Sequence, residues 1–487
     1  MTVLAIDQGT TSTKAYLLDP DGGFRSVGSV LHRQILPGPG RVEHDAAELL
    51  AAIDGLIDAA LQMATDIRAI ALANQGETVV AWDRLTGQPL YHAIVWQDQR
   101  TQGWIDALTP DQRALVLDRA GLPCDAYFSA AKLAWLLREV PQVAWAAQQG
   151  RLGLGTSDAF FLDRLTGTYA TDVTTASRTS LMHLSRCTWD PELCALFGVP
   201  IDLLPPIRPS AAPFGPVTRQ GREVPVLVSL VDQQAALFGH GCRDPGDAKI
   251  TFGTGSFALA VAGAAPPVPR DGLVPTVAWQ FAGQPPVYAL EAGDYTAAAA
   301  VDWCRSIGLA GSLQDFACGD VTPAILRHIA FVPALAGLAA PWWRRDAQVA
   351  FFGLTQSSTL ADMRQAVIEG VALRGADLID LICGAGRKPI SVDGGLAQND
   401  HLVQMLANAL GRPVHRHHSA DLTALGAGMM AWAVLGHDWV EAGNKARDVV
   451  EPDTQAAQVQ AARRYFRAAV QAVMTLAAHR PDGRGQA

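Results

Sequence analysis

The chain has 487 residues, of which 49% are apolar and 17% are charged, and its formal net charge is −9 at pH 7. A chain of this length usually folds as two domains, and this balance of residue types is typical of a globular enzyme with large buried layers. The negative charge, without a basic stripe, argues against a nucleic-acid-binding protein.

The sequence also indicates a compartment. The chain begins with an apolar strand pattern and not with a basic-then-apolar leader, and its seven cysteines are scattered without a CxxC pair. The most apolar late stretch, residues 423–436, is too short and too rich in glycine to span a bilayer. We therefore expect a reduced, cytoplasmic protein with no membrane partner.

The first half of the chain opens with a strand, a turn of small polar residues and a second strand. The turn is Gln8-Gly9-Thr10-Thr11-Ser12, and Asp7 ends the strand before it. Later in this half, a strand over 225–230 leads into Asp232 and a short helix over 235–239. The other elements expected here are a helix over 46–64, strands over 66–73, 79–82 and 93–96, and a helix over 130–138.

The second half begins with a similar unit. A strand over 247–252 leads into Gly253-Thr254-Gly255-Ser256-Phe257, much like the turn at Gly9. Two such units among strands and long helices predict a duplicated α/β fold with one phosphate-binding turn in each half. We expect domains over 1–240 and 241–480 and a tail over 481–487. The other elements expected are helices over 295–307, 359–383, 399–410, 424–435 and 454–479, and a strand over 389–392.

The two glycine turns have the composition of phosphate-binding sites. Backbone N–H groups and the hydroxyls that follow Gly9 and Gly253 can face an anion, and Lys14 adds a point charge. Asp7 is placed to bind a hard cation directly or through water. For the Gly9 turn by itself, a hairpin without a ligand is the alternative interpretation.

Asp232 is the best candidate for a general base. It ends a strand, begins a helix and lies one element before the second glycine turn. A carboxylate there can orient an alcohol and accept its proton during phosphoryl transfer, which otherwise needs mainly positioning and charge neutralisation. From spacing alone, a helix N-cap is an equally good interpretation of this aspartate.

Two further stretches have a small-residue pattern. The turn Asp393-Gly394-Gly395 lies between a strand and a helix, which suits the close approach of a nucleotide. Residues 423–428 begin a helix with small side chains, for which close helix packing is the favoured interpretation. Polar and aromatic residues suited to a polyol follow several strands: Glu77, Trp96, Asp98, Arg100 and Tyr127.

Taken in order, these motifs resemble the FGGY family of carbohydrate kinases over nearly the whole chain, and the glycerol kinases within it most. Single motifs are weak, but this many in the family's order with similar spacing are specific. The motifs that carry the resemblance are Asp7–Ser12, 39–45 (PGRVEHD), 93–98 (AIVWQD), 127–135, 176–179 (ASRT), Asp232–Gly239, Gly253–Gly255, 352–355 (FGLT) with Glu369, 392–395 (VDGG) and 423–427 (TALGA).

The resemblance implies two actin-like (ribonuclease H-like) ATPase domains with a cleft between them. It implies ATP and Mg²⁺ as cofactors and transfer of the γ-phosphoryl group to a hydroxyl of a small polyol or sugar. Asp232 matches the family's catalytic base and Asp7 its metal-associated aspartate. The residues at its ATP-binding positions are Gly9, Thr10, Thr11, Ser12, Lys14, Gly253, Thr254, Gly395 and Asn399. Those at its glycerol-binding positions are Gly76, Glu77, Trp96, Tyr127, Asp232, Gln233 and Phe257.

Two positions depart from the glycerol kinase pattern. Lys14 stands where these enzymes have arginine, so the charge is kept but the bidentate fork is lost. Gly76 stands where they have an arginine that hydrogen-bonds the substrate. Losing that donor weakens glycerol binding, and the freed space favours a longer molecule. The sequence therefore leaves open a kinase for a four- or five-carbon polyol or ketose of the erythritol, xylulose or ribulose type.

Two readings from other classes compete with a small-molecule kinase. An actin- or chaperone-like ATPase would share both phosphate turns, but it would also need a filament or peptide-binding surface, and no added C-terminal binding domain is visible. An inactive kinase-like protein is disfavoured because Asp7 and Asp232 are both present. The assembly, a homodimer or a homotetramer, is left open.

Overall fold

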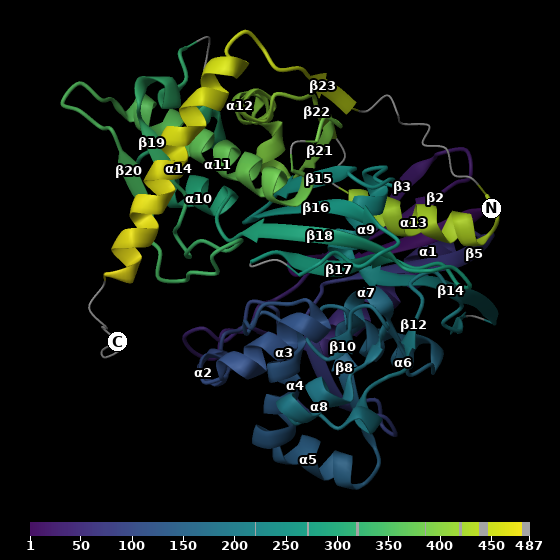
Figure 1. Cartoon of the computed structure of the whole chain (residues 1–487). Helices are drawn as coiled ribbons and strands as arrows, with labels where there is room; N and C mark the ends of the chain where they lie inside the picture. The colour runs from purple at the N-terminus through teal and green to yellow at the C-terminus, as the bar shows by residue number, and fades with distance from the viewer. Residues whose placement is uncertain are drawn as a thin grey trace.

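The computed structural model describes residues 1–219, 221–269, 272–317, 321–384, 386–417, 421–437 and 447–479. Its centre holds two mixed sheets (Figure 1), one of six strands in the order β13-β14-β5-β1-β2-β3 and one of seven in the order β17-β18-β16-β15-β21-β22-β23. The α/β fold with two halves expected from the sequence is confirmed. The expected tail over 481–487 lies outside the described residues.

The second sheet repeats the pairing of the first. In the first, β1, β2 and β3 are antiparallel neighbours, while β1, β5 and β14 are parallel. In the second, β15, β16 and β18 are antiparallel neighbours, while β15, β21 and β22 are parallel. The strands of the first are β1 (Thr2–Gln8), β2 (Ser12–Leu18), β3 (Phe24–Leu31), β5 (Ile67–Asn74), β13 (Pro216–Arg219) and β14 (Arg222–Val231). Those of the second are β15 (Ala248–Phe252), β16 (Ser256–Gly263), β17 (Val274–Trp279), β18 (Val287–Asp294), β21 (Ile390–Asp393), β22 (Val414–His417) and β23 (Arg447–Val450).

The first half carries a large insertion, the lower lobe of Figure 1. A four-stranded sheet in the order β4-β7-β6-β8 forms part of this half. Its strands are β4 (Glu43–His44), β6 (Val79–Asp83), β7 (Ala93–Ile94) and β8 (Leu152–Thr156). The short pairs are β9 (Thr171–Asp172) with β12 (Ile207–Arg208), and β10 (Met182–His183) with β11 (Thr188–Trp189). The helices of this half are α1 (Ala46–Met63), α2 (Gln102–Asp106), α3 (Pro110–Ala120), α4 (Ser129–Glu139), α5 (Pro141–Gln148), α6 (Ser157–Thr166), α7 (Val173–Ala176), α8 (Pro191–Phe197) and α9 (Asp232–Gly239).

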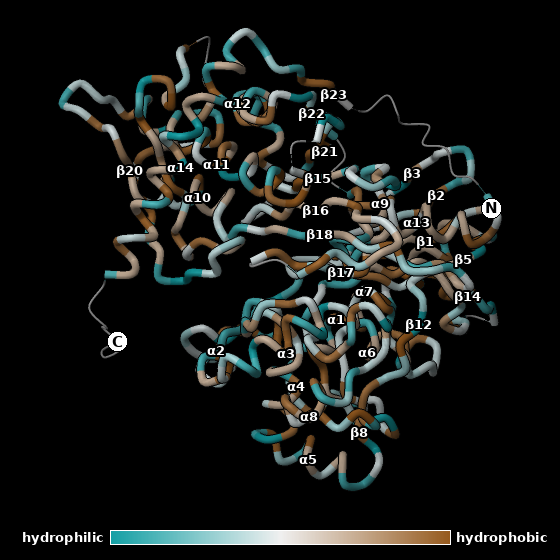
Figure 2. Tube along the Cα trace, viewed as in Figure 1, coloured by the Kyte–Doolittle hydropathy of each residue, from teal (hydrophilic) through white to brown (hydrophobic). Residues whose placement is uncertain are grey.

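Local sequence accounts for these elements. Helix α1 begins where the Asp45 carboxylate accepts the N–H groups of Ala47 and Glu48, and its apolar stripe, including Leu49 and Ile53, is buried against the first sheet. Strand β5 is a continuous apolar run because it is a central, parallel strand covered on both faces. Figure 2 shows apolar residues recurring along the central strands, with hydrophilic stretches mainly in outer loops.

The second half adds helices, most of which lie in the upper left of Figure 1. They are α10 (Ala298–Ser306), α11 (Leu360–Cys383), α12 (Asp400–Leu410), α13 (Leu422–Val434) and α14 (Ala456–Ala478), with a hairpin of β19 (Ala330–Val332) and β20 (Ala350–Phe352). Of these helices, α13 lies on the right of Figure 1, beside α9. Helix α10 starts later than the expected residue 295, because Ala297 and Ala298 donate their N–H groups to the carbonyls of Thr254 and Gly253. In the described part of the chain, none of the helices combines the length and apolar character needed to cross a membrane.

Helix α13 joins the two halves. It packs on α9 so closely that a Cβ at Gly426 would overlap the carbonyl oxygen of Ala235, and one at Gly239 would overlap that of Leu422. The close helix packing expected for the small-residue stretch is therefore confirmed. Apolar residues of α13, of the first sheet and of β16–β18 share one buried cluster, so both halves are part of a continuous core.

Candidate active site

Parallel pairing brings the principal candidates to one sheet edge. Strands β1, β5 and β14 are parallel, and their register places Asp7 beside Ala73 and Val231 beside Asn74. Asp7, the Gly76 loop and Asp232 therefore all follow the same carboxyl edge, where loops after parallel strands commonly build ligand sites. The sequence predicted each strand end, and the topology makes them neighbours.

The carboxylates at this edge interact. Burial raises the pKa of Asp7 to about 7, with Lys14 lowering it and Asp421 raising it. Burial also raises the pKa of Asp232 to about 7, the charges of Asp7 and Glu77 raise it further, and the Gln233 N–H group and Lys249 lower it. Two neighbouring carboxylates with raised pKa values make this edge a candidate functional site.

Asp232 is not the N-cap of α9. Val231 occupies the cap position, and Asp232 is the first helical residue, with its carboxylate accepting the N–H of Gln233 at 2.6 Å. The N-cap interpretation of this residue is therefore wrong. Because the carboxylate is not used to cap the helix, it is available for chemistry.

The first glycine turn is held from two sides. The Gly9 N–H donates to the Ser12 carbonyl at 3.0 Å, which closes the hairpin. The Trp96 indole donates to the Thr10 hydroxyl at 2.9 Å, so a substrate candidate touches the turn directly. The Lys14 ammonium forms an ion pair with Asp421 at 2.9 Å, which anchors its charge beside Asp7.

The second and third glycine turns lie against each other. At Gly394, whose φ is +96°, a Cβ would overlap the backbone of Phe252, the residue before Gly253. Gly395 has open space where a side chain would be, so its backbone is accessible. Asn399 caps α12 by accepting the Leu402 N–H at 2.9 Å and donates to the Phe316 carbonyl at 3.1 Å. Its side chain therefore has a structural role close to the turn.

Glu77 sits in a strained turn. Its φ is +56°, and the Thr78 N–H donates to the Gly76 carbonyl at 2.7 Å, the hydrogen bond of a γ-turn. A non-glycine residue held in this region is uncommon and marks functional sites. Beside it, the rings of Trp96 and Tyr127 make an edge contact with centroids 5.6 Å apart, which gives an apolar wall.

Two sequence candidates belong to another network. Asp98 and Arg100 pair with each other at 2.7 Å, and Arg100 also pairs with Glu43 at 2.6 Å. The Asp98 carboxylate accepts the Val42 N–H at 2.7 Å, so this network fixes the loop after β7. These two residues support the position of Trp96 instead of facing the site.

The space beside Gly76 is not empty. A Cβ built there would lie 3.1 Å from Cγ1 of Val231, the residue before Asp232. The expectation that a missing side chain leaves free volume is therefore only partly met, because Val231 fills the nearest part. The sequence comparison of position 76 by itself does not reveal this neighbour.

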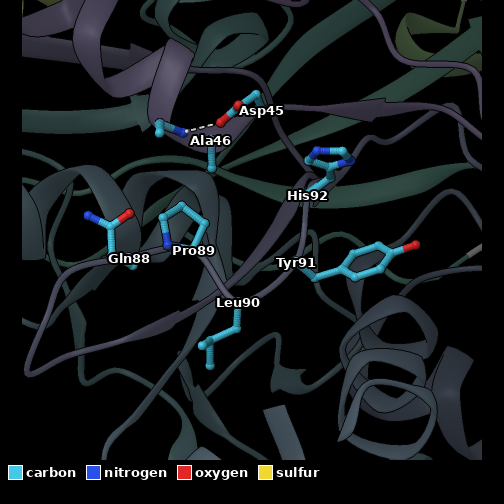
Figure 3. Close-up of a pocket in the computed structure, with 8 residues that line it drawn as sticks. Asp45, Ala46, Gln88, Pro89, Leu90, Tyr91 and His92 are labelled. Atoms are coloured by element: carbon cyan, nitrogen blue, oxygen red, sulfur yellow. Dashed lines mark hydrogen bonds between the residues drawn. The ribbon is translucent and has the colours of Figure 1, made fainter. Parts of the chain in front are cut away.

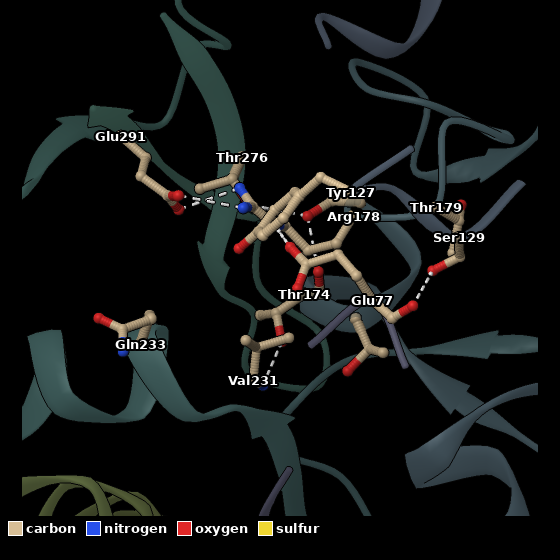
Figure 4. A network of polar contacts seen from close by, with 12 residues as sticks. Glu77, Tyr127, Ser129, Thr174, Arg178, Thr179, Val231, Gln233, Thr276 and Glu291 are labelled. Atoms are coloured by element: carbon tan, nitrogen blue, oxygen red, sulfur yellow. Dashed lines mark hydrogen bonds and ion pairs between the residues drawn. The ribbon is translucent and has the colours of Figure 1, made fainter. Parts of the chain in front are cut away.

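Three residues to which the sequence assigned no role join the candidates: Arg178, Lys249 and Glu291. Arg178 lies between Glu77 and Glu291 (Figure 4), and the Lys249 ammonium donates to the Gln233 amide oxygen at 2.5 Å and to the Thr251 hydroxyl at 2.9 Å. Lys249 is fully buried within β15, and a lysine inside the apolar run 248–252 is the signal that would have found it. Arg178 lies in the ASRT motif, which contributed to the family resemblance but to which the sequence assigned no role.

A separate surface depression of about 590 Å³ lies on the first half (Figure 3). It is lined by Asp45, Ala46, Ala47, Gln88, Pro89, Leu90, Tyr91 and His92. It contains none of the candidate phosphate, base or substrate residues. The depression is therefore separate from the candidate site at the strand edge.

The family follows from the match to known sequences. Residues 2–239 match the N-terminal domain of the FGGY family of carbohydrate kinases, and residues 248–434 match its C-terminal domain. The chain belongs to the FGGY family of carbohydrate kinases. It is therefore a phosphotransferase.

The named relatives of this FGGY kinase agree with the family assignment. It is 39% identical to a glycerol kinase of Cereibacter sphaeroides, with 97% of this chain and 99% of the relative covered. It is 40% identical to one of Bdellovibrio bacteriovorus, with 88% and 90% covered. The structure of Plasmodium falciparum glycerol kinase with ADP has a TM-score of 0.89 at 28% identity, with 97% of this chain and 98% of that chain covered. The fold is also that of a xylulose kinase from Lactobacillus acidophilus, with a TM-score of 0.86 at 23% identity and 98% and 99% covered.

Both matched parts of the FGGY kinase contribute to the candidate site. Glu77 and Asp232 lie in the N-terminal part, and Lys249 and Glu291 in the C-terminal part. The contacts of Lys249 with Gln233 and of Arg178 with Glu291 therefore join the two parts at the site.

Proposed function

We propose that this kinase transfers the γ-phosphoryl group of ATP to a hydroxyl of a small polyol or sugar, with Asp232 as the general base. The observation that carries the proposal is the Asp232 carboxylate, which does not cap α9 and lies at the edge shared with Asp7 and Glu77. A base with a pKa near neutrality accepts a proton readily from an alcohol at the moment the oxygen attacks phosphorus. Membership of a carbohydrate kinase family favours this reading over an actin- or chaperone-like ATPase.

ATP is assigned to the two glycine turns and the turn that follows β21. The malarial glycerol kinase, which shares the fold and was solved with ADP, supports an adenine nucleotide as the ligand. We place the phosphates between the two turns and the nucleoside toward the third, at the positions predicted from sequence: Gly9, Thr10, Thr11, Ser12, Lys14, Gly253, Thr254, Gly395 and Asn399. We keep the domain division at residue 240, because each of the two domains then carries one of the two glycine turns, at Gly9 or at Gly253.

The residues at the edge fit Mg²⁺. The described residues hold no cluster of three or more His, Cys, Asp or Glu side chains suited to a metal, and Mg²⁺ in kinases typically needs only one or two carboxylates together with substrate phosphates. The half-buried Asp7, whose neighbouring ammonium is already paired with Asp421, is the carboxylate that we assign to the ion. When bound, the ion would neutralise charge on the phosphates. The chain's own part is to hold the Asp7 carboxylate at the turn.

For the substrate we propose Glu77, Trp96, Tyr127, Gln233 and Phe257 as binding residues, around Gly76. Glycerol kinases are the named relatives, and Gly76 is the observation that favours a four- or five-carbon polyol or ketose instead. An ADP-release assay over three- to six-carbon polyols and ketoses tests this choice. The highest kcat/KM on glycerol would reject the longer substrates, and no turnover on any of them would reject the proposed function.

The pH dependence of kcat/KM should follow Asp232. Its pKa is raised to about 7, so the base is protonated below this pH and ionised above it. We expect kcat/KM to fall about tenfold per pH unit as the pH drops below the apparent pKa, and to level off above it. A rate profile between pH 5.5 and 9 at saturating ATP measures this. A flat profile across pH 7 would contradict the assignment.

Position 76 should accept an arginine only if the side chain at position 231 is made smaller. Gly76→Arg alone pushes against Val231 Cγ1, and overpacking of this kind costs about 1–3 kcal/mol of stability. The double variant Gly76→Arg, Val231→Gly removes the contact and should recover most of that loss. We also expect it to raise kcat/KM for glycerol relative to longer polyols. Thermal unfolding and the substrate panel measure both effects; equal Tm values for the single and double variants would contradict the packing argument.

A further inference from the structure

The buried network around Arg178 connects the substrate side to the C-terminal sheet. The side chain lies just after α7 and is 2% exposed. Its Nε donates to Glu77 Oε1 at 2.6 Å, and its two terminal nitrogens meet the two carboxylate oxygens of Glu291 at 3.0 and 3.1 Å (Figure 4). A planar guanidinium thus bridges two carboxylates, one from each half of the chain.

Substrate candidates surround this guanidinium. It lies 5.8 Å from the ring centroid of Tyr127 and 5.6 Å from that of Phe128, within the range of cation–π contacts. Glu77 and Tyr127 are both proposed substrate residues. Arg178 therefore contacts the pocket itself and not only its support.

Two neighbouring positions, 132 and 76, do not take the place of the Arg178 guanidinium. The Lys132 ammonium, which is also buried near Glu77, donates to the carbonyls of Ala126 and Tyr127 at 3.1 and 2.6 Å. Position 76 carries no side chain, and Val231 Cγ1 lies 3.1 Å from where a Cβ would be. Val231 is held in turn by its N–H bond to the Thr174 hydroxyl at 2.9 Å, on α7. The short α7 thus positions Val231, and Arg178 follows directly after the C-cap of the same helix.

We propose that Arg178, two residues after α7, is a specificity-determining residue of the substrate pocket, which positions the Glu77 carboxylate and is itself held in place by Glu291 of the C-terminal sheet. The inference rests on the proposed polyol kinase function. Arg178 fixes the Glu77 carboxylate as an acceptor for a substrate hydroxyl. Because Glu291 belongs to the sheet that carries the Gly253 turn, polyol recognition depends on a residue from the nucleotide half.

The test measures kcat/KM for three- to five-carbon polyols in four variants. Arg178→Gln should lower kcat/KM for the best polyol about 100-fold and leave the KM for ATP within about twofold, since the lost buried charge bonds Glu77 and Glu291, neither of which is assigned to ATP. Arg178→Lys should retain part of this activity, with an altered ranking of polyols, because the charge stays but the fork is lost. Glu291→Gln should act in the same direction, through a higher KM for the polyol.

Arg463→Lys is the matched control. Arg463 is also a buried guanidinium shared between two carboxylates, Asp377 at 2.5 Å and Asp380 at 2.8 Å, but it lies on α14. We expect it to lower Tm without changing the ranking of polyols. A change of ranking in this control would mean that loss of any buried ion pair produces the effect, which would overturn the proposal.

The outcomes separate the two claims. If Arg178→Gln folds and keeps the native ranking and a kcat/KM within threefold, the proposal is overturned. If Arg178→Gln does not fold, the Glu291→Gln variant decides. A native ranking of polyols and a native kcat/KM in that variant would also overturn the proposal. If the native enzyme turns over no polyol, the proposed function fails, and calorimetric binding of polyols to the native and Glu291→Gln proteins then tests Arg178; equal binding, or none, overturns the inference.

Discussion

Replacing Asp232 by asparagine should lower kcat by about 10²–10⁴-fold while leaving ATP binding nearly intact. The amide keeps the shape of the side chain and can still accept the Gln233 N–H, but it cannot accept a proton from the substrate hydroxyl. Turnover under saturating ATP and polyol, with ATP affinity by calorimetry, measures the two effects. Turnover within threefold of the native rate would remove Asp232 from the role of base.

The same variant has a signature in stability. An aspartate whose folded pKa is raised to about 7 binds more protons folded than unfolded, so its ionisation lowers the free energy of unfolding as the pH rises from about 4 to 7. Asp232→Asn removes this loss. We expect the variant to have a higher Tm than the native protein at pH 8 and a smaller difference at pH 5. A lower Tm at pH 8 would contradict burial as the cause of the raised pKa.

Replacing Lys249 by methionine should lower kcat/KM by about 100-fold. Lys249 is fully buried, holds the Gln233 amide oxygen, and its charge acts on both Asp232 and Asp393. Methionine keeps most of the volume but leaves buried carboxylates with less positive charge nearby. Because Lys249 lowers the pKa of Asp232, the acid limb of the rate profile should also move to higher pH.

Lys388→Met is the charge-matched control for this prediction. Lys388 forms an exposed ion pair with Asp247 at 2.7 Å on the same half of the chain. We expect nearly native kcat/KM and an unmoved acid limb, because a surface pair is screened by solvent. Lys249→Arg should fall between the two, since the charge remains. An unchanged rate profile in Lys249→Met would show that the lysine only fills space.

What the sequence determined by itself was local chemistry. The turn residues after Gly9 and Gly253, the strand ending at Asp232 and the helix over 46–64 are each set by a few neighbouring residues, because turn geometry, capping and hydrophobic periodicity act over short distances. The two glycine units also indicated the duplication that the repeated strand pairing confirms. Element ends shifted by a few residues where a distant contact intervened, as at Ala298.

Only the tertiary structure decided which of these pieces meet. Arg178 lies 101 residues from Glu77 and 113 residues from Glu291 in sequence, and Val231 fills the place beside Gly76, so no local pattern specifies either contact. A buried charge is favourable only where partners converge on it from several elements, and that convergence is a property of the packed sheets. For the same reason, the sequence placed Asp98 and Arg100 among substrate candidates, while in the fold Arg100 pairs with both Asp98 and Glu43 and the network supports the loop that carries Trp96.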